Sequence, residues 1–515
     1  MMKKIAGVLL LAGLVLVCIG CGGGSSGGAA SSTVEGSEYK DTITWGQGAD
    51  VTSFDPHVGR QTPAVQVTNH IFDTLVQFDG TSSEVIPQIA ESWEQLSPTS
   101  YRFHIRQGIK FHDGTDLTAE DVKYSLDRAV ASSMISYLMD FISETIIEDP
   151  YTVVVNTHFP YAPTLRNLSV PFAAILPKAY TETDPDSQAK KPVGSGPYKF
   201  VSWTQSDSAV LEAFADYYAD PPKTKNLVMK VIPEASQRTI ALETGEIDLA
   251  YDLPSNDHKL ITGNEKLSLF LAPPLSLFYL SMHMEKAPFE NKLVRQAISH
   301  AIDRQLIIDT VVSGAAQAAD AIIAPGVYGY YSAGVDQYDP ELSKQLLAQA
   351  GYPNGFTTNL WVNNNQERVE VSTAIVDMLR EVGITAKLEV MEAGAFWDKT
   401  DNGEHEMAFF GWITSTKDAD YTYYSLGHSS KFGPGGNTSY ISEPQVDALI
   451  EKGRNSTEPA TREQAYKDLA ILLADLTPYI SIMYSPISVG GNKLVENFEP
   501  DPIGYHRLEN VQVRK

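Results

Sequence analysis

Hydrophobic and polar residues follow two different periods along this chain, and the two patterns alternate from residue 43 onward. Alternation with a period of two predicts strands, as over 101–106, where aromatic or aliphatic residues alternate with polar ones. Apolar residues at helical spacing predict helices over 65–75, 293–312 and 461–475. Alternating strands and helices are typical of α/β domains, so the pattern predicts an α/β fold.

Short-range signals mark where some of these elements begin and end. Thr118 precedes a helical pattern that runs to about residue 131, and Thr is a common N-cap residue whose oxygen accepts a free backbone N–H. Asp121 follows it, where the positive end of the helix dipole favours negative charge. Another helical pattern, over 340–350, is followed by Gly351, and glycine is the usual residue directly after a helix. We therefore expect one helix to begin after Thr118 and another to end before Gly351.

The chain begins with a basic segment and an apolar run, a pattern typical of export signals. Lys3 and Lys4 precede apolar residues 5–17, which are too few to span a bilayer. A small residue, Gly20, stands directly before Cys21, as it does in bacterial lipoprotein signals. We expect cleavage before Cys21 and lipid on its thiol, which would anchor an extracytoplasmic protein to the cell membrane. The alternative is an ordinary secretory signal with a chance cysteine.

A Gly/Ser-rich segment follows the expected cleavage point. Residues 1–20 would be the removed signal, and residues 21–37 have the composition of a flexible tether between a membrane and a folded domain. The sequence does not distinguish the periplasm from the outer face of a single cytoplasmic membrane.

Composition narrows the class of protein. A hydrophobic fraction of 43% and an aromatic fraction of 10% exclude a disordered chain. A net charge of −25 without clustered Lys and Arg argues against nucleic acid as a partner. No cysteine follows Cys21, so the mature chain offers no disulfide, thiolate zinc site or cysteine nucleophile. Beyond the signal, no apolar run approaches the ~20 residues of a membrane-spanning helix, so the lipid is the only expected anchor.

Catalytic and metal-binding patterns do not assemble. The sequence contains neither an H-E-x-x-H zinc motif nor a P-loop, and no two of its 11 histidines are four residues apart. His104 with His112, or His405 with His428, could meet in space, but a lone histidine is more commonly a hydrogen-bonded structural residue. We therefore expect no catalytic residue, no cofactor and no metal site built by the protein itself.

Four stretches in a fixed order carry a resemblance to a known family. They read VIPQIAESW at 85–93 with YRFHIRQGIKFHDG at 101–114, GSGPYKF at 194–200, VRQAISHAIDR at 294–304, and LLAQAGYPNGF at 346–356. Together they resemble the family 5 extracellular solute-binding proteins, the receptors of dipeptide, oligopeptide, glutathione and nickel ABC importers. The resemblance extends from about residue 43 to residue 510.

The resemblance implies a periplasmic-binding-protein type II fold, an α/β fold with two lobes and a subdomain inserted in lobe I. Ligand would be enclosed between the lobes when a hinge closes. The expected boundaries are 38–80 with 195–280 and 497–515 for lobe I, 81–194 for the inserted subdomain, and 281–496 for lobe II.

The segment after Trp412 is expected to set ligand specificity, with Trp412 itself packing on the ligand or, alternatively, in the core. In the dipeptide binders, the residue three positions after this tryptophan is an aspartate that grips the ligand's α-ammonium. Here that residue is Ser415, which supplies only a neutral hydrogen bond. The pattern is closer to the glutathione-binding branch, in which case Asp418 or Asp420 would take a cationic group. Alternatively, each aspartate is a loop cap or a salt-bridge partner.

The arginine that binds the peptide carboxylate in dipeptide binders has no clear counterpart here. Arg368 belongs to the start of a helix by sequence, and Asn363 is the nearest candidate. In the loop 54–62, Arg60 could replace the missing cation, or it could be an ordinary surface arginine. The full set of expected ligand contacts is Arg60, Gln61, Tyr279, His283, Asn363, Trp412, Ser415, Asp418, Asp420 and Tyr421; Tyr279 and His283 have a structural role as the alternative.

The leading hypothesis is a monomeric, lipid-anchored binding protein that delivers a short peptide or peptide-like solute to the permease subunits of an ABC transporter. A binder of a metal chelate, as in nickel uptake, is an alternative within the same family. A sensory receptor and a secreted hydrolase are alternatives from other classes, and the hydrolase lacks a recognisable nucleophile–base pair.

Overall fold

The computed structural model describes residues 38–515 except 60, 81 and 335. The expected signal, the tether, the lipidation site Cys21 and the candidate Arg60 therefore lie outside the described residues. The chain divides into two units, Met1–Glu38 and Tyr39–Lys515, and the second unit carries the fold. Among the helices of the described ranges, none is both long and apolar enough to cross a membrane.

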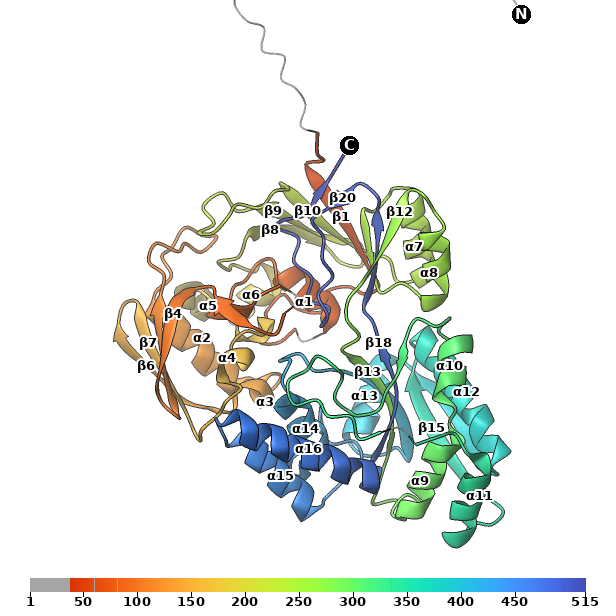
Figure 1. The fold of residues 1–515 in the computed structure, drawn as a ribbon. Coiled ribbons are helices and arrows are strands. Elements are labelled where there is room, and N and C mark those ends of the chain that lie inside the picture. The colour runs from red at the N-terminus through yellow and green to blue at the C-terminus, as the bar shows by residue number, and fades with distance from the viewer. Residues whose placement is uncertain (1–37, 60, 81, 335) are drawn as a thin grey trace, which may run out of the picture. The chain divides into compact units, whose positions relative to one another are not determined.

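Two large sheets organise this unit (Figure 1). The seven-stranded sheet has the order β12-β19-β11-β1-β10-β9-β8, in which β1 pairs in parallel with both β10 and β11. Its strands are β1 (Thr42–Gln47), β8 (Tyr198–Thr204), β9 (Ser208–Ala213), β10 (Asn226–Val231), β11 (Leu249–Tyr251), β12 (Leu267–Leu271) and β19 (Ser488–Asn492).

The six-stranded sheet has the order β14-β18-β13-β17-β15-β16, with β15 parallel to β16 and β17. Its strands are β13 (Ser276–Met282), β14 (Gln317–Ala318), β15 (Thr357–Asn363), β16 (Thr385–Met391), β17 (Met407–Ile413) and β18 (Tyr479–Ser485).

Helices cover both faces of the six-stranded sheet, as Figure 1 shows. Leu280 and Met282 of β13 face the core shared with α9–α12, whereas Leu277 and Tyr279 face the core shared with α13–α16. This division follows from the two-residue period of a strand, which sends successive side chains to opposite faces. These helices are α9 (Lys292–Ala301), α10 (Arg304–Thr310), α11 (Pro340–Gln349), α12 (Gln366–Glu381), α13 (Ala393–Asp401), α14 (Ala419–Gly427), α15 (Pro444–Arg454) and α16 (Pro459–Leu476).

A four-stranded antiparallel sheet, β4-β5-β7-β6, lies in the segment between β3 and β8 and packs on α2. The strands are β4 (Ala90–Ser97), β5 (Ser100–Ile105), β6 (Ile142–Asp149) and β7 (Thr152–Thr157). The remaining strands form two short ribbons, β2 (Val76–Phe78) with β3 (Val85–Pro87) and β20 (Val495–Glu496) with β21 (Gln512–Val513). The remaining α-helices are α1 (Thr62–Thr68), α2 (Ala119–Ala131), α3 (Ser136–Met139), α4 (Thr164–Asn167), α5 (Lys178–Thr183), α6 (Ser187–Lys190), α7 (Ala235–Glu243) and α8 (His258–Thr262).

The structure confirms the predicted helix ends. α2 begins at Ala119, and the Asp121 carboxylate accepts a hydrogen bond of 2.9 Å from the backbone N–H of Thr118. α11 ends at Gln349, and Gly351 has a φ of +94°, a left-handed conformation that glycine adopts without steric cost.

Two predicted helices differ from the structure. The pattern over 293–312 is divided into α9 and α10, because the Asp303 carboxylate caps a new helix by accepting from the backbone N–H of Leu306 at 2.9 Å. The helix predicted over 65–75 is α1, which ends at Thr68. Periodicity alone does not detect a break where a capping residue restarts the same hydrophobic spacing.

The strand pairings bear on where the chain passes between the large sheets. β13 belongs to the six-stranded sheet, although the expected boundary of lobe I lies at residue 280. β19 belongs to the seven-stranded sheet, although the expected boundary of lobe II lies at residue 496. The chain thus passes from one sheet to the other between Leu271 and Ser276 and returns between Ser485 and Ser488. The division into lobes itself stays a prediction.

Gly196, in the family motif at 194–200, packs directly on backbone and yields a test of the fold. A Cβ atom added to Gly196 would lie 2.6 Å from the carbonyl carbon of Ile71, so we expect Gly196→Ala to lower the free energy of unfolding by about 1–3 kcal/mol. Gly394→Ala is the matched control, because Gly394 lies in α13 with no atom within 4 Å of an added Cβ, and alanine there should raise stability by up to about 1 kcal/mol. Denaturant unfolding of both variants measures the difference, and equal effects would contradict this packing.

Candidate functional site

The carboxyl ends of the parallel strands meet where the two large sheets approach each other. β11 ends at Tyr251 in the seven-stranded sheet, and β15 ends at Asn363 in the six-stranded sheet. The segments that follow these strands are in contact, because the Ser255 hydroxyl donates to the Glu367 carboxylate at 2.8 Å. Ligands of open α/β sheets bind outside the carboxyl ends of the strands, so this junction is the candidate site.

The end of β17 and the start of α14 bring an aromatic pair to the junction. Trp412 stacks on Tyr421 with ring centroids 5.1 Å apart and an interplanar angle of 27°. The indole N–H of Trp412 donates to the hydroxyl of Thr422 at 2.8 Å, which fixes the ring orientation. Both rings are half-buried, so each keeps part of its surface accessible. Tyr421 also stacks on Tyr137, with ring centroids 6.2 Å apart.

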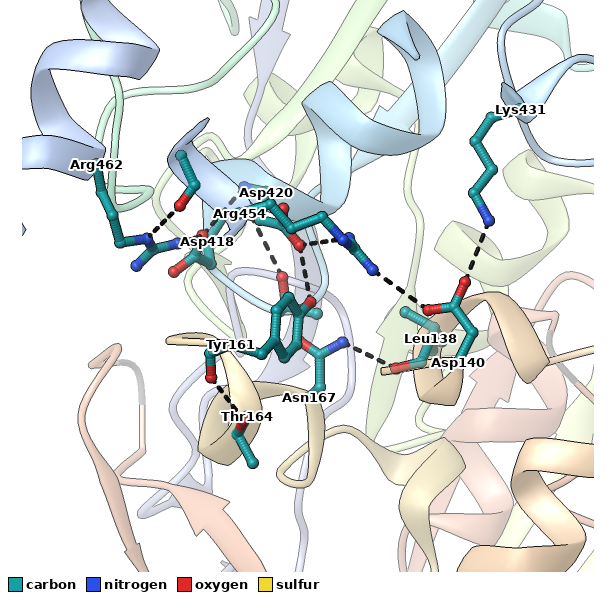
Figure 2. Close-up of polar contacts among 12 residues, drawn as sticks. Leu138, Asp140, Tyr161, Thr164, Asn167, Asp418, Asp420, Lys431, Arg454 and Arg462 are labelled. Carbon is teal, nitrogen blue, oxygen red and sulfur yellow. Dashed lines mark hydrogen bonds and ion pairs between the residues drawn. The ribbon is translucent and has the colours of Figure 1, made fainter. Parts of the chain in front are cut away.

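Asp418 is fully buried and caps α14 by accepting from the backbone N–H of Asp420 at 3.0 Å. Its Oδ1 also accepts from the Arg462 guanidinium at 2.7 Å (Figure 2). The Nε of Arg166 lies 3.9 Å from Oδ2. The structure thus places Asp418 in both roles weighed as alternatives to ligand binding, a cap and an ion pair.

Asp420 lies in a second buried ion pair, which Figure 2 also shows. Its Oδ2 accepts from the Tyr161 hydroxyl at 2.7 Å and from Arg454 Nη1 at 2.9 Å. Burial raises the pKa of the Asp420 carboxyl, and the Arg454 charge opposes that rise. Oδ1 of Asp420 and Oδ2 of Asp418 have no hydrogen-bond partner among the described residues. A role for either carboxylate in ligand binding therefore stays a prediction. A ligand cation bound to one of them would share that carboxylate with an arginine.

Three smaller polar candidates lie at strand ends or loops. Ser415 is buried beside Tyr421, and Asn363 is buried at the end of β15, where its side-chain oxygen accepts from the backbone N–H of Asn365 at 3.4 Å. Gln61 is exposed before α1, and its side-chain oxygen accepts from the Thr52 hydroxyl at 2.9 Å. No ligand contact is established for these residues.

Tyr279 and His283 each stack on another aromatic side chain. Tyr279 is 2% exposed and stacks on Phe410, with ring centroids 5.5 Å apart. His283 follows β13, and its backbone N–H donates to Glu406 before β17, so it lies at the end of the sheet opposite Ile413 and the candidate site. It stacks on Tyr440, and burial lowers the pKa of the imidazole to about 4.

His405, one of the histidines weighed as metal ligands, lies beside His283. The ring of His405 lies 5.5 Å from that of His283, and no cluster of three or more metal-ligating side chains occurs among the residues that the structure describes.

Arg368, which the sequence places at the start of a helix and which is not among the expected contacts, lies at the same junction. It lies in the first turn of α12, as expected, and its guanidinium lies 5.3 Å from the centre of the Phe278 ring. Phe278 and Gly411 are cross-strand partners, and the guanidinium also lies against Gly411, where an added Cβ would lie 2.4 Å from Nη2 of Arg368.

The ion pair of Asp420 gives a prediction about stability. Arg454→Met should lower the free energy of unfolding by about 3–5 kcal/mol, because it leaves a buried carboxylate without its cation. Arg380→Met is the control: Arg380 pairs with Asp377 at 2.6 Å on the surface, where such a pair contributes about 1 kcal/mol or less. Denaturant unfolding compares the variants, and a loss at Arg454 no larger than that at Arg380 would show that the buried pair does not stabilise the fold.

Comparisons with known proteins agree with this geometry. Residues 84–434 match the family described as bacterial extracellular solute-binding proteins, family 5 Middle. The dipeptide-binding protein of Escherichia coli K12 is 30% identical over 476 residues, which cover 86% of this chain and 89% of that protein. The glutathione-binding protein GsiB of Pectobacterium atrosepticum is 30% identical over 479 residues, which cover 90% and 93%.

A solved structure of similar fold is the ABC transporter-associated periplasmic binding protein DppA from Helicobacter pylori in complex with the peptide STSA. It is 30% identical, has a TM-score of 0.85, and the match covers 92% of this chain and 98% of that one. These relatives are solute-binding proteins and not enzymes. The chain therefore belongs to the family 5 bacterial extracellular solute-binding proteins and has the periplasmic-binding-protein type II fold.

Proposed function

We propose that this protein captures a short peptide or peptide-like solute outside the cytoplasm and delivers it to the permease subunits of an ABC transporter. The observation that carries the proposal is the half-buried Trp412–Tyr421 pair beside the facing carboxyl ends of β11 and β15. Flat aromatic faces suit the backbone and side chains of a peptide. The names of the dipeptide-binding and glutathione-binding relatives support the same class of solute.

Closure of two lobes around the solute is the mechanism that we propose. Contacts that join the expected inserted subdomain (81–194) to the part of the chain built on the six-stranded sheet support this mechanism. Asp140 pairs with Lys431 at 3.2 Å and with Arg454 at 3.3 Å. The Lys417 ammonium donates to the carbonyl oxygen of Ser82 at 2.7 Å. Such contacts form only when the two parts are close, and a solute that touches both parts would shift the population toward closure.

Within this proposal, the expected contacts have different roles. Trp412 and Tyr421 would provide the aromatic surface, and Ser415, Asn363, Gln61 and Arg60 would provide polar contacts. Asp418 and Asp420 would chiefly hold the loop through Arg462 and Arg454, because each carboxylate already has a cationic partner.

A peptide-binding measurement tests the function. We expect the tetrapeptide Ser-Thr-Ser-Ala to raise the thermal unfolding midpoint by mass action and to lower the radius of gyration in small-angle scattering. Trp412→Ala should weaken binding roughly tenfold, because it removes a large aromatic contact. Trp93→Ala, in β4 of the inserted segment, should leave the affinity unchanged. Binding without any change in radius would exclude closure, and an unaffected Trp412 variant would exclude the aromatic contact.

The membrane anchor is a separate part of the proposal. Cleavage before Cys21 would leave a lipid-modified cysteine and the tether 21–37 at the start of the mature chain. We expect Cys21→Ala to remain an unlipidated precursor, whereas Cys18→Ala, inside the removed signal, should still mature. Metabolic labelling with a fatty acid and the size of the mature protein distinguish these outcomes, and label on the Cys21 variant would refute the assignment.

A further inference from the structure

One carboxylate bridges two cations where the expected inserted subdomain (81–194) meets the part of the chain built on the six-stranded sheet. Oδ2 of Asp140, which directly follows α3, lies 3.2 Å from Nζ of Lys431, and Oδ1 lies 3.3 Å from Nη2 of Arg454 (Figure 2). Lys431 lies between α14 and α15, and Arg454 is the last residue of α15. None of these three residues is among the expected ligand contacts, so the bridge calls for a role of its own.

The two cations depend on Asp140 to different degrees. Arg454 also pairs with the buried Asp420 at 2.9 Å, so it keeps an acidic partner when Asp140 moves away. Lys431 makes no second ion pair with the described residues. The Lys431 ammonium lies 4.6 Å and the Arg454 guanidinium 3.7 Å from the centre of the Tyr424 ring. Two positive charges so close to one ring repel each other, and a carboxylate that contacts both lowers the repulsion.

A tyrosine side chain crosses the same boundary. Tyr161, which lies between β7 and α4, donates to the Asp420 carboxylate at 2.7 Å, and its ring centre lies 4.9 Å from the Arg454 guanidinium. If the two parts separate, Asp420 loses this hydroxyl but keeps Arg454. The contact can therefore break without leaving a buried charge unpaired, which is the costly event for a buried ion pair.

The parts on either side of the bridge have separate hydrophobic cores. Phe103 and Val155 belong to one core, and Ile450 and Leu469 belong to the other. Among the described residues, no buried residue belongs to both cores. The Asp140 side chain is 35% exposed, so the bridge is polar and reached by water. A polar interface between parts with their own cores is typical of parts that move relative to each other.

We propose that Asp140 forms an ionic latch with Lys431 and Arg454, which strengthens solute binding by stabilising the closed state without touching the solute. This inference rests on the proposed function, because it assigns a device to the proposed closure. The solute and the latch favour the same state, so each strengthens the other. The latch adds the same increment for every solute, whereas the candidate site selects among solutes. Salt screens partly exposed charges, so high salt weakens the latch.

Asp140→Asn tests the latch, because it removes the charge and keeps the size of the side chain. In titration calorimetry, it should weaken binding of Ser-Thr-Ser-Ala and of glutathione by the same factor, roughly three- to tenfold. The loss should appear as faster dissociation, since the latch forms after the solute has entered. High salt should weaken binding by the unaltered protein more than binding by this variant.

Asp127→Asn is the matched control. Asp127 pairs with Lys123 at 2.8 Å within α2, so this partly exposed ion pair does not cross the boundary. Its variant should bind both solutes as tightly as the unaltered protein. Lys431→Met should weaken binding by itself but add little to Asp140→Asn, because both changes remove the same ion pair. Without solute, Asp140→Asn should lower the unfolding midpoint no more than Asp127→Asn does.

Small-angle scattering without solute separates this inference from the proposed function. Asp140→Asn should have a larger radius of gyration than the unaltered protein, and Asp127→Asn should not. If neither solute binds, the proposed function fails, and this radius alone decides whether the latch exists. If the solutes bind but the two variants bind them equally, the latch is wrong while solute binding stands. If Asp140→Asn weakens binding of one solute only, Asp140 contacts that solute and the latch is likewise overturned.

Discussion

The buried ion pairs of Asp418 and Asp420 determine where the loop after β17 lies. Each carboxylate lies at the beginning of α14, and each is held by an arginine from the helices that follow, Arg462 in α16 and Arg454 at the end of α15. Tyr161, which lies between β7 and α4, donates a hydrogen bond to the same network. Since the aromatic pair of the candidate site stands at the two ends of this loop, on β17 and α14, its position depends on these buried charges.

This arrangement explains why an acid-rich loop need not select a cation. Along the sequence, two aspartates after Trp412 suggest a site for a cationic group. In space, their charges are compensated by arginines that lie tens of residues further along. At the junction, Arg368 makes no ion pair with a described residue, and the charges of Asp252 and Glu367 act on it only through space. The electrostatic character of the site thus follows from which charges remain unpaired and not from which charges are most numerous.

Local chemistry predicted much of the fold, and long-range pairing accounts for what it missed. The start of α2 at Thr118 and the end of α11 before Gly351 depend on neighbouring residues, so the sequence predicted both. The break between α9 and α10 depends on whether Asp303 caps a helix or lies within one, and periodicity does not decide that. The family motifs led to the fold and to the Trp412 segment. They did not distinguish Arg454 and Arg462, which are partners of the aspartates, from Arg368, which has none, because such pairing is a property of the folded chain.

The order of strands in the seven-stranded sheet has a consequence for how this protein folds. β11 lies between β1, near the start of the described chain, and β19, which begins at Ser488. β11 therefore pairs with β19 only when nearly the whole chain is present. Contacts between residues so far apart in the sequence slow folding. A polypeptide that crosses a membrane as an unfolded thread benefits from this delay, because a sheet that cannot close early leaves the chain extended until its last strands emerge on the far side.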